Sequence, residues 1–303
     1  MMLTYLHLDV FTDQLFAGNQ LAVYLDPPRD LSGAVMQAIA REMAFSETTF
    51  VFPPEAPGTD YRVRIFTPGS ELPMAGHPTI GTAFALAHAG RFEAGRASTV
   101  FGEGVGPIPI DLDWQDGALR FAWMTQPAPV FGASLDRLDT LAAAIGLETA
   151  DLRPHGWPVQ EVSCGGPFLI IPVASRAAVD RAAPDARTLT RAFAEQGWPT
   201  RAVYLFTLDR RADEADVYTR MFAPDIGIPE DPATGSASGP LGAYLVHHRL
   251  PIGTGRPIRN LQGVRMGRPS WMFIEPVLEG TTITGVRVGG GAVVAGTGTL
   301  NLR

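Results

Sequence analysis

The chain has 303 residues, a formal net charge of −7 and 46% hydrophobic residues. All 24 basic residues are arginine, because the sequence contains no lysine, and Cys164 is the one cysteine. These counts exclude a lysine Schiff base, a phosphate-binding loop with its lysine, a catalytic pair of thiols and a cysteine-rich zinc site. The six histidines show no metal-ligand spacing, so we expect no metal.

The N-terminus lacks a basic stretch and reaches Asp9 early, so its pattern predicts a strand and not a signal peptide. No apolar run approaches the roughly 20 residues of a membrane helix, which argues against a membrane partner. Net negative charge without a basic stripe argues against nucleic acid. The single cysteine is compatible with a reducing compartment, and we expect a cytoplasmic protein acting on a small molecule.

Many short strands and few helices indicate an α+β protein. The first half of the chain has a definite order of predicted helices and strands. A helical periodicity covers residues 31–43, and an apolar strand follows at 48–52. A second strand at 61–66 ends in Phe-x-Pro. A glycine-bearing loop then leads to a helix that begins near His77.

The second half repeats this order of elements. A helical pattern at 187–196 precedes strands at 202–207 and 217–222, and the second of these strands also ends in Phe-x-Pro. A loop again leads to a helix, which begins near Ser236. The repeat predicts two similar domains, joined by a linker near residues 125–129 where the composition becomes loop-like. A cleft between two domains is a common place for a ligand.

Both helix starts are rich in glycine and lie beside a titratable residue. Gly76 precedes His77, and Gly235 follows Asp231 by four positions. The unpaired N–H groups at a helix N-terminus attract anions, so the pair is compatible with a pocket for a carboxylate. Ser and Thr are also frequent as ordinary helix caps, and for either segment alone the cap is the commoner explanation.

The chain resembles the PhzF-type isomerases of phenazine biosynthesis. The strings that carry the resemblance are SETTFVF (46–52), RIFTPGSELPMAGHPTIGTA (64–83), PEDPATGSASGPLGAYL (229–245) and LQGVRMGRPS (261–270). The resemblance implies the diaminopimelate-epimerase-like fold: two pseudo-symmetric domains, each a β-barrel-like sheet around a central helix. It implies an N-terminal domain of residues 1–125, completed by 289–303, a C-terminal domain of residues 126–288, and an active site in the cleft between them.

The resemblance also implies site residues. Catalytic roles are carried over to Glu47, His77 and Asp231, and substrate-binding roles to Gly18, Asn19, Gly76, Gly235 and Ser236. Without the resemblance, Glu47 reads as a structural carboxylate at a strand edge. His77 is compatible with a proton donor, a substrate contact or a helix-start side chain, and Asp231 with a partner of His77, a contact for a substrate amine or a turn cap. Gly18 and Asn19 are first of all a turn signal.

These expectations describe a cofactor-independent isomerase in which Glu47 moves a proton between carbons of a small amino or hydroxy carboxylic acid. The resemblance suggests a dihydro-hydroxyanthranilate-type substrate and a homodimer. Two alternatives remain open. One is a lyase or dehydratase, in which the same base expels a leaving group; the other is a non-catalytic ligand-binding protein on an enzyme fold.

Overall fold

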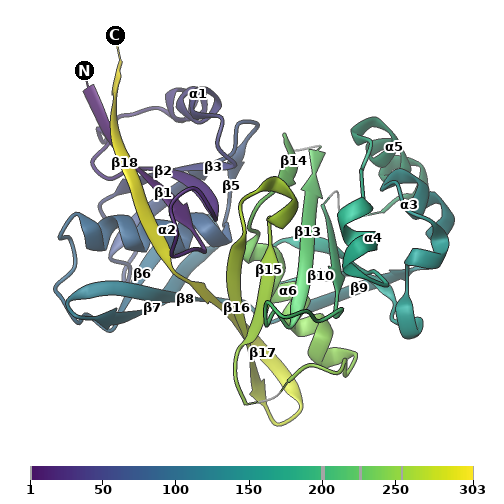
Figure 1. Cartoon of the computed structure of the whole chain (residues 1–303). Coiled ribbons are helices and arrows are strands. Elements are labelled where there is room, and N and C mark those ends of the chain that lie inside the picture. The colour runs from purple at the N-terminus through teal and green to yellow at the C-terminus, as the bar shows by residue number, and fades with distance from the viewer. Residues whose placement is uncertain (1, 199–201, 225–226, 254, 303) are drawn as a thin grey trace. The chain divides into compact units, whose positions relative to one another are not determined.

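The computed structural model describes residues 2–198, 202–224, 227–253 and 255–302. The chain divides into two compact units, which are coloured along the chain in Figure 1. Unit 1 comprises Met1–Thr125 and Val288–Arg303, and unit 2 comprises Gln126–Arg287.

Unit 1 is built mainly of strands. Its elements are β1 (Met2–Val10), β2 (Asn19–Tyr24), α1 (Gly33–Met43), β3 (Glu47–Phe52), β4 (Tyr61–Phe66), β5 (Glu71–Leu72), α2 (Gly76–His88), β6 (Ser98–Glu103), β7 (Gly106–Gln115), β8 (Ala118–Gln126) and the C-terminal strand β18 (Ala292–Asn301). β18 pairs antiparallel with β1 along its whole length, as Figure 1 shows. The two ends of the chain therefore belong to one sheet.

Unit 2 has more helices. Its elements are β9 (Val130–Leu135), α3 (Leu138–Ala144), the short 3₁₀ turns Thr149–Asp151 and Pro154–Gly156, β10 (Val159–Ser163), β11 (Pro167–Pro172), α4 (Arg176–Arg181), α5 (Ala186–Gln196), β12 (Val203–Thr207), β13 (Val217–Ala223), β14 (Ile228–Asp231), α6 (Gly235–His247), β15 (Ile258–Gln262), the 3₁₀ turn Val264–Met266, β16 (Ser270–Glu279) and β17 (Thr282–Gly290), whose last residues count with unit 1.

The two units share one pairing scheme, which confirms the duplication expected from the sequence. In unit 1, β2 pairs parallel with β3, β3 antiparallel with β4, β4 antiparallel with β5 and parallel with β6, and β6 antiparallel with β7. In unit 2 the same relations join β11 to β12, β12 to β13, β13 to β14 and β15, and β15 to β16. The fold is thus two pseudo-symmetric domains of the diaminopimelate-epimerase-like class.

The helices α2 and α6 occupy equivalent places in the two units. Each has 13 residues and is buried on nearly every side, which explains why neither shows an amphipathic period. At Gly81 of α2, an added Cβ would lie 2.5 Å from the Leu21 side chain and 2.7 Å from that of Val10. Glycine therefore lets α2 approach β1 and β2 closely.

The other long helix of unit 1, α1, is amphipathic instead. Its buried residues Met36, Ile39 and Ala40 follow helical spacing and pack with aromatic side chains of the sheet. The helix begins two residues later than the sequence pattern predicts, because the Ser32 hydroxyl accepts a hydrogen bond from the Val35 N–H and caps the first turn.

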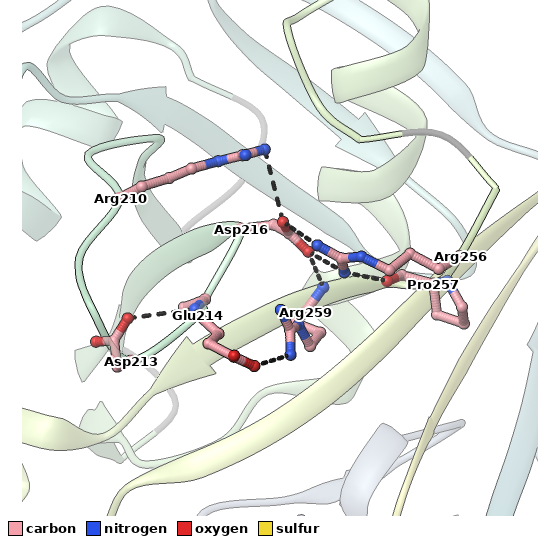
Figure 2. A network of polar contacts seen from close by, with 8 residues as sticks. Arg210, Asp213, Glu214, Asp216, Arg256, Pro257 and Arg259 are labelled. Carbon is pink, nitrogen blue, oxygen red and sulfur yellow. Dashed lines mark hydrogen bonds and ion pairs between the residues drawn. The ribbon is translucent and has the colours of Figure 1, made fainter.

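A network of arginines and acids ties β13 to β15 in unit 2 (Figure 2). Asp216 is its centre: its carboxylate accepts two hydrogen bonds from Arg256, at 2.6 and 2.7 Å, and one from the backbone N–H of Arg259 at 2.9 Å. Burial alone would raise the pKa of Asp216, but these hydrogen bonds hold it below its ordinary value. The ionised form is therefore part of the folded structure.

Replacing Asp216 by Asn is expected to lower the free energy of unfolding by roughly 1–3 kcal/mol at pH 7, because buried donors lose a charged acceptor. The depressed pKa means that this contribution is present above the ordinary aspartate pKa and is lost as the pH falls through the lower pKa of the folded state. Urea denaturation of the Asp216→Asn variant and of the parent protein at pH 7 and pH 3 measures the difference in their free energies of unfolding. Glu214→Gln is the matched control, since Glu214 contacts Arg259 from a largely exposed position and should change stability by less than about 0.5 kcal/mol.

Candidate active site

In unit 1 the fold brings three of the predicted site residues together. Glu47 is the first residue of β3, His77 the second of α2, and Asn19 the first of β2. All three are buried. The Asn19 side-chain amide lies 3.0 Å from Nδ1 of His77, and Oε2 of Glu47 lies 3.4 Å from Nε2 of the same ring. Residues far apart in the sequence thus form one buried polar group in unit 1.

His77 is neutral in this setting. Burial lowers the pKa of His77 to about 3, and a hydrogen bond to the Gln20 backbone offsets this only in part. The contact with Glu47 is therefore one between a carboxyl group and a neutral imidazole, although its distance meets the criterion for an ion pair. Nδ1 of the ring lies next to the Asn19 side-chain amide, and Nε2 is the ring nitrogen that faces Glu47.

The ring nitrogen that faces Glu47 is not satisfied within the protein. Among the described residues, Nε2 of His77 has no hydrogen-bond partner, and its exposed area is below 1 Å². A buried polar atom without a partner costs about 1–3 kcal/mol. Proteins keep such atoms mainly where a ligand or the chemistry uses them.

Gly18 and Asn19 have separate roles. Gly18 has a φ of +65°, and a Cβ there would lie 2.3 Å from the carbonyl oxygen of Val10. This position therefore requires glycine for the turn into β2. The turn places Asn19 at the start of β2, where its side chain reaches His77. The turn explanation thus holds for Gly18, and a substrate contact by either residue stays a prediction.

The starts of α2 and α6 lack the side-chain cap that α1, α4 and α5 have, and α3 lacks one as well. Ser32, Ser175 and Asp185 cap α1, α4 and α5 through side-chain hydrogen bonds. The residues before α2 and α6, Ala75 and Thr234, make no side-chain cap. The ordinary-cap explanation therefore does not apply to these two helices, and their first N–H groups suit an anion.

Unit 2 holds the remaining predicted site residues. Asp231 ends β14, Gly235 begins α6, and Ser236 follows it in a half-buried position. Oδ2 of Asp231 accepts a hydrogen bond of 2.6 Å from the Thr234 hydroxyl. Asp231 therefore contacts the residue that directly precedes α6, and its roles as a turn cap and in chemistry stay predictions.

The thiol of Cys164 is poorly suited to catalysis. Cys164 is buried in unit 2, and burial raises the pKa of its thiol to about 12. The thiolate, which is the reactive form, is then scarce at neutral pH. In the part of the chain that the structure describes, no group of three or more His, Cys, Asp and Glu side chains is placed to hold a metal ion.

Three further buried polar residues lie beside the two helix starts, and the sequence patterns do not mark them as site residues: Glu103, Thr234 and Gln262. A signal existed for Glu103, because alternation along β6 places it on the buried face with Thr99 and Phe101. Thr234 lies in the family motif at residues 229–245, and Gln262 in the motif at residues 261–270. Their roles depend on contacts that only the folded chain creates.

Comparison with known proteins supplies the family. The family model for phenazine biosynthesis-like proteins, PhzC-PhzF, matches residues 8–298. The chain belongs to this family. An uncharacterized isomerase of Mesorhizobium japonicum is 36% identical over 98% of both chains. The trans-2,3-dihydro-3-hydroxyanthranilate isomerase of Pseudomonas aeruginosa is 38% identical over 94% of this chain and 95% of its own.

The fold of the PhzF family agrees with the structure. A PhzF-family phenazine biosynthesis protein of Bacillus anthracis superimposes with a TM-score of 0.88 at 28% identity, covering both chains fully. Together the names and folds of the relatives support an isomerase. None of the helices within the described ranges is both long and apolar enough to cross a bilayer.

Proposed function

We propose that this PhzF-family protein is a cofactor-independent isomerase that moves a proton between carbons of a small amino- or hydroxy-substituted carboxylic acid. The observation that carries the proposal is the buried pair of Glu47 and neutral His77, with a ring nitrogen that lacks a partner among the described residues. The relatives named as trans-2,3-dihydro-3-hydroxyanthranilate isomerases suggest the substrate class.

Glu47 is the proposed base and acid. Ionised, it removes a proton from an activated carbon; protonated, it returns that proton to a second carbon of the same molecule. A general acid or base must lie within hydrogen-bond reach of its target, so the substrate would occupy the space that Glu47 and Nε2 of His77 face. Because His77 is neutral at physiological pH, we assign it a hydrogen bond to a substrate oxygen and not delivery of the proton.

Four other residues are proposed to bind the substrate. The uncapped helix starts at Gly76 and Gly235 suit carboxylate oxygens, Ser236 suits a hydroxyl or carboxylate, and Asp231 suits the amino group. The absence of lysine and the raised thiol pKa of Cys164 support a carboxylate as the proton carrier.

Incubation with trans-2,3-dihydro-3-hydroxyanthranilate in deuterated water tests the reaction. An isomerase yields a product of unchanged formula, with at most one solvent deuterium on carbon. A lyase acting on the same compound expels water and yields the aromatic anthranilate, 18 mass units lighter. Binding without turnover would point to the ligand-binding alternative, and mass spectrometry with proton NMR separates the three outcomes.

Two further properties belong to the proposal. We propose a homodimer in the cytoplasm, consistent with the single buried cysteine. Light scattering coupled to size-exclusion chromatography checks the oligomeric state. A particle of about the mass of one chain, 32.5 kDa, would contradict the homodimer.

A further inference from the structure

A buried chain of hydrogen bonds surrounds Asp231 in unit 2. Gln262 lies on β15, and its side chain is fully buried. Its Nε2 lies 2.7 Å from the backbone oxygen of Asp231 and 3.0 Å from the Thr234 hydroxyl. Its Oε1 accepts hydrogen bonds from the Thr234 N–H, at 3.2 Å, and from the Tyr204 hydroxyl, at 3.0 Å.

The backbone contacts fix the direction of the hydrogen bonds that join Gln262, Thr234 and Asp231. A backbone carbonyl only accepts and a backbone N–H only donates, so the amide of Gln262 has one possible orientation. Its Nε2 then donates to the Thr234 hydroxyl. The single hydroxyl hydrogen of Thr234 is left for Asp231, whose Oδ2 lies 2.6 Å away. This distance is typical of a hydroxyl that donates to an ionised carboxylate.

The duplication shows that the fold itself does not need this arrangement. An offset of 159 residues relates Gly76 to Gly235, the starts of α2 and α6. The same offset places Leu72 at the position of Asp231, Ala75 at that of Thr234 and Glu103 at that of Gln262. The same local architecture therefore forms in unit 1 without the aspartate, the threonine or the amide.

We propose that Thr234 and Gln262 are positioning residues that hold Asp231 ionised and in a single orientation for the isomerase reaction. The inference rests on the proposed function, since it concerns how Asp231 meets the substrate. Gln262 orients the Thr234 hydroxyl, and Thr234 orients the carboxylate. A carboxylate that accepts such a hydrogen bond keeps its charge to lower pH.

Thr234→Val removes the hydroxyl at nearly constant volume, and Thr234→Ser restores it. We expect Thr234→Val to lower kcat about 10- to 100-fold with KM changed less than about threefold, and Thr234→Ser to recover most of the activity. Carbon-13 NMR of the assigned Asp231 carboxyl supplies a readout that needs no substrate. The pKa of Asp231 should rise by about one unit in Thr234→Val and return in Thr234→Ser.

Thr207→Val is the matched control. Thr207 is also buried in unit 2, and its hydroxyl accepts a hydrogen bond from the Asp209 N–H and has no part in the chain around Asp231. It should lose a similar amount of stability without changing kcat or the Asp231 titration. Normal kcat and an unshifted Asp231 in Thr234→Val would overturn the positioning role. Full activity in Glu47→Gln would instead overturn the proposed function, and the Asp231 titration would still decide whether Thr234 holds the carboxylate.

Discussion

Glu47→Gln is expected to lower kcat for the proton shift about 10³-fold, equivalent to about 4 kcal/mol of transition-state stabilisation. The amide has the shape of the carboxylate and retains a contact with His77, but it cannot accept a proton from carbon. KM should change less than about threefold, because the substituted group acts on the reacting carbon more than on binding. Steady-state kinetics with trans-2,3-dihydro-3-hydroxyanthranilate, together with the exchange of solvent deuterium into product, measures both effects.

Glu42→Gln serves as the control for this experiment. Glu42 lies on α1 in the same unit and is exposed, so the same chemical change there should leave kcat, KM and stability as they are. A Glu47→Gln protein that turns substrate over at the normal rate would show that another group carries the proton. Retained ligand binding in the inactive variant would show that the site itself is still folded.

Glu103→Gln is expected to stabilise the protein, by about 3 kcal/mol at pH 7. Burial raises the pKa of Glu103 to about 8, and the Thr79 hydroxyl offsets this only in part. The unfolded chain releases this proton near the ordinary glutamate pKa, whereas the folded chain holds it until about pH 8. Folding therefore takes up a proton between these values, and stability falls as the pH rises through this range. The amide removes the cost because it carries no charge.

The hydrogen bonds of Thr79 agree with a neutral Glu103. The Thr79 hydroxyl lies 2.7 Å from the backbone oxygen of Ala75 and 2.5 Å from Oε1 of Glu103. Its single hydrogen cannot serve both acceptors. If Glu103 is protonated, it donates to Thr79 and Thr79 donates to Ala75, so each of the two hydrogens has an acceptor. Unit 2 already carries an amide at the equivalent position, Gln262.

Urea denaturation and hydrogen exchange of α2 at pH 5, 7 and 9 measure the effect of Glu103→Gln. The difference from the parent protein should be small at pH 5 and grow towards pH 8. Glu55→Gln provides the comparison, since Glu55 is a largely exposed carboxylate in the same unit and should change stability little at any pH. Equal stabilities of the Glu103→Gln protein and the parent at pH 9 would show that Glu103 is not the group whose proton is linked to folding.

The sequence predicted the repeated order of elements because that order depends on local properties. Strand alternation, Phe-x-Pro at the ends of β4 and β13, and glycine with proline at the helix starts all act within a few residues. The central helices were harder to delimit. Because α2 and α6 are buried on nearly every side, they lack the apolar stripe that marks α1, and only their starting regions could be predicted from the sequence.

Some features of the candidate site could also be predicted from the sequence, and others arise only in the folded chain. Glu47, His77 and Asp231 lie in short motifs, so the sequence alone could name them through the family resemblance. The neutral state of His77 could not be read from the motif, because it results from burial by strands distant in the sequence. The sequence also could not predict the hydrogen bond between Thr234 and Gln262, which lie 28 positions apart. The same holds for the contact between Thr79 and Glu103, which lie 24 positions apart.

The sequence by itself therefore determined the duplicated α+β architecture, the family and the residues available for proton transfer, since lysine is absent and Cys164 is the one thiol. Only the tertiary structure decided which of these groups are charged and which way their hydrogen bonds point. The physical reason is that protonation states depend on desolvation and on hydrogen-bond partners, and both arise when strands and helices far apart in the chain pack together.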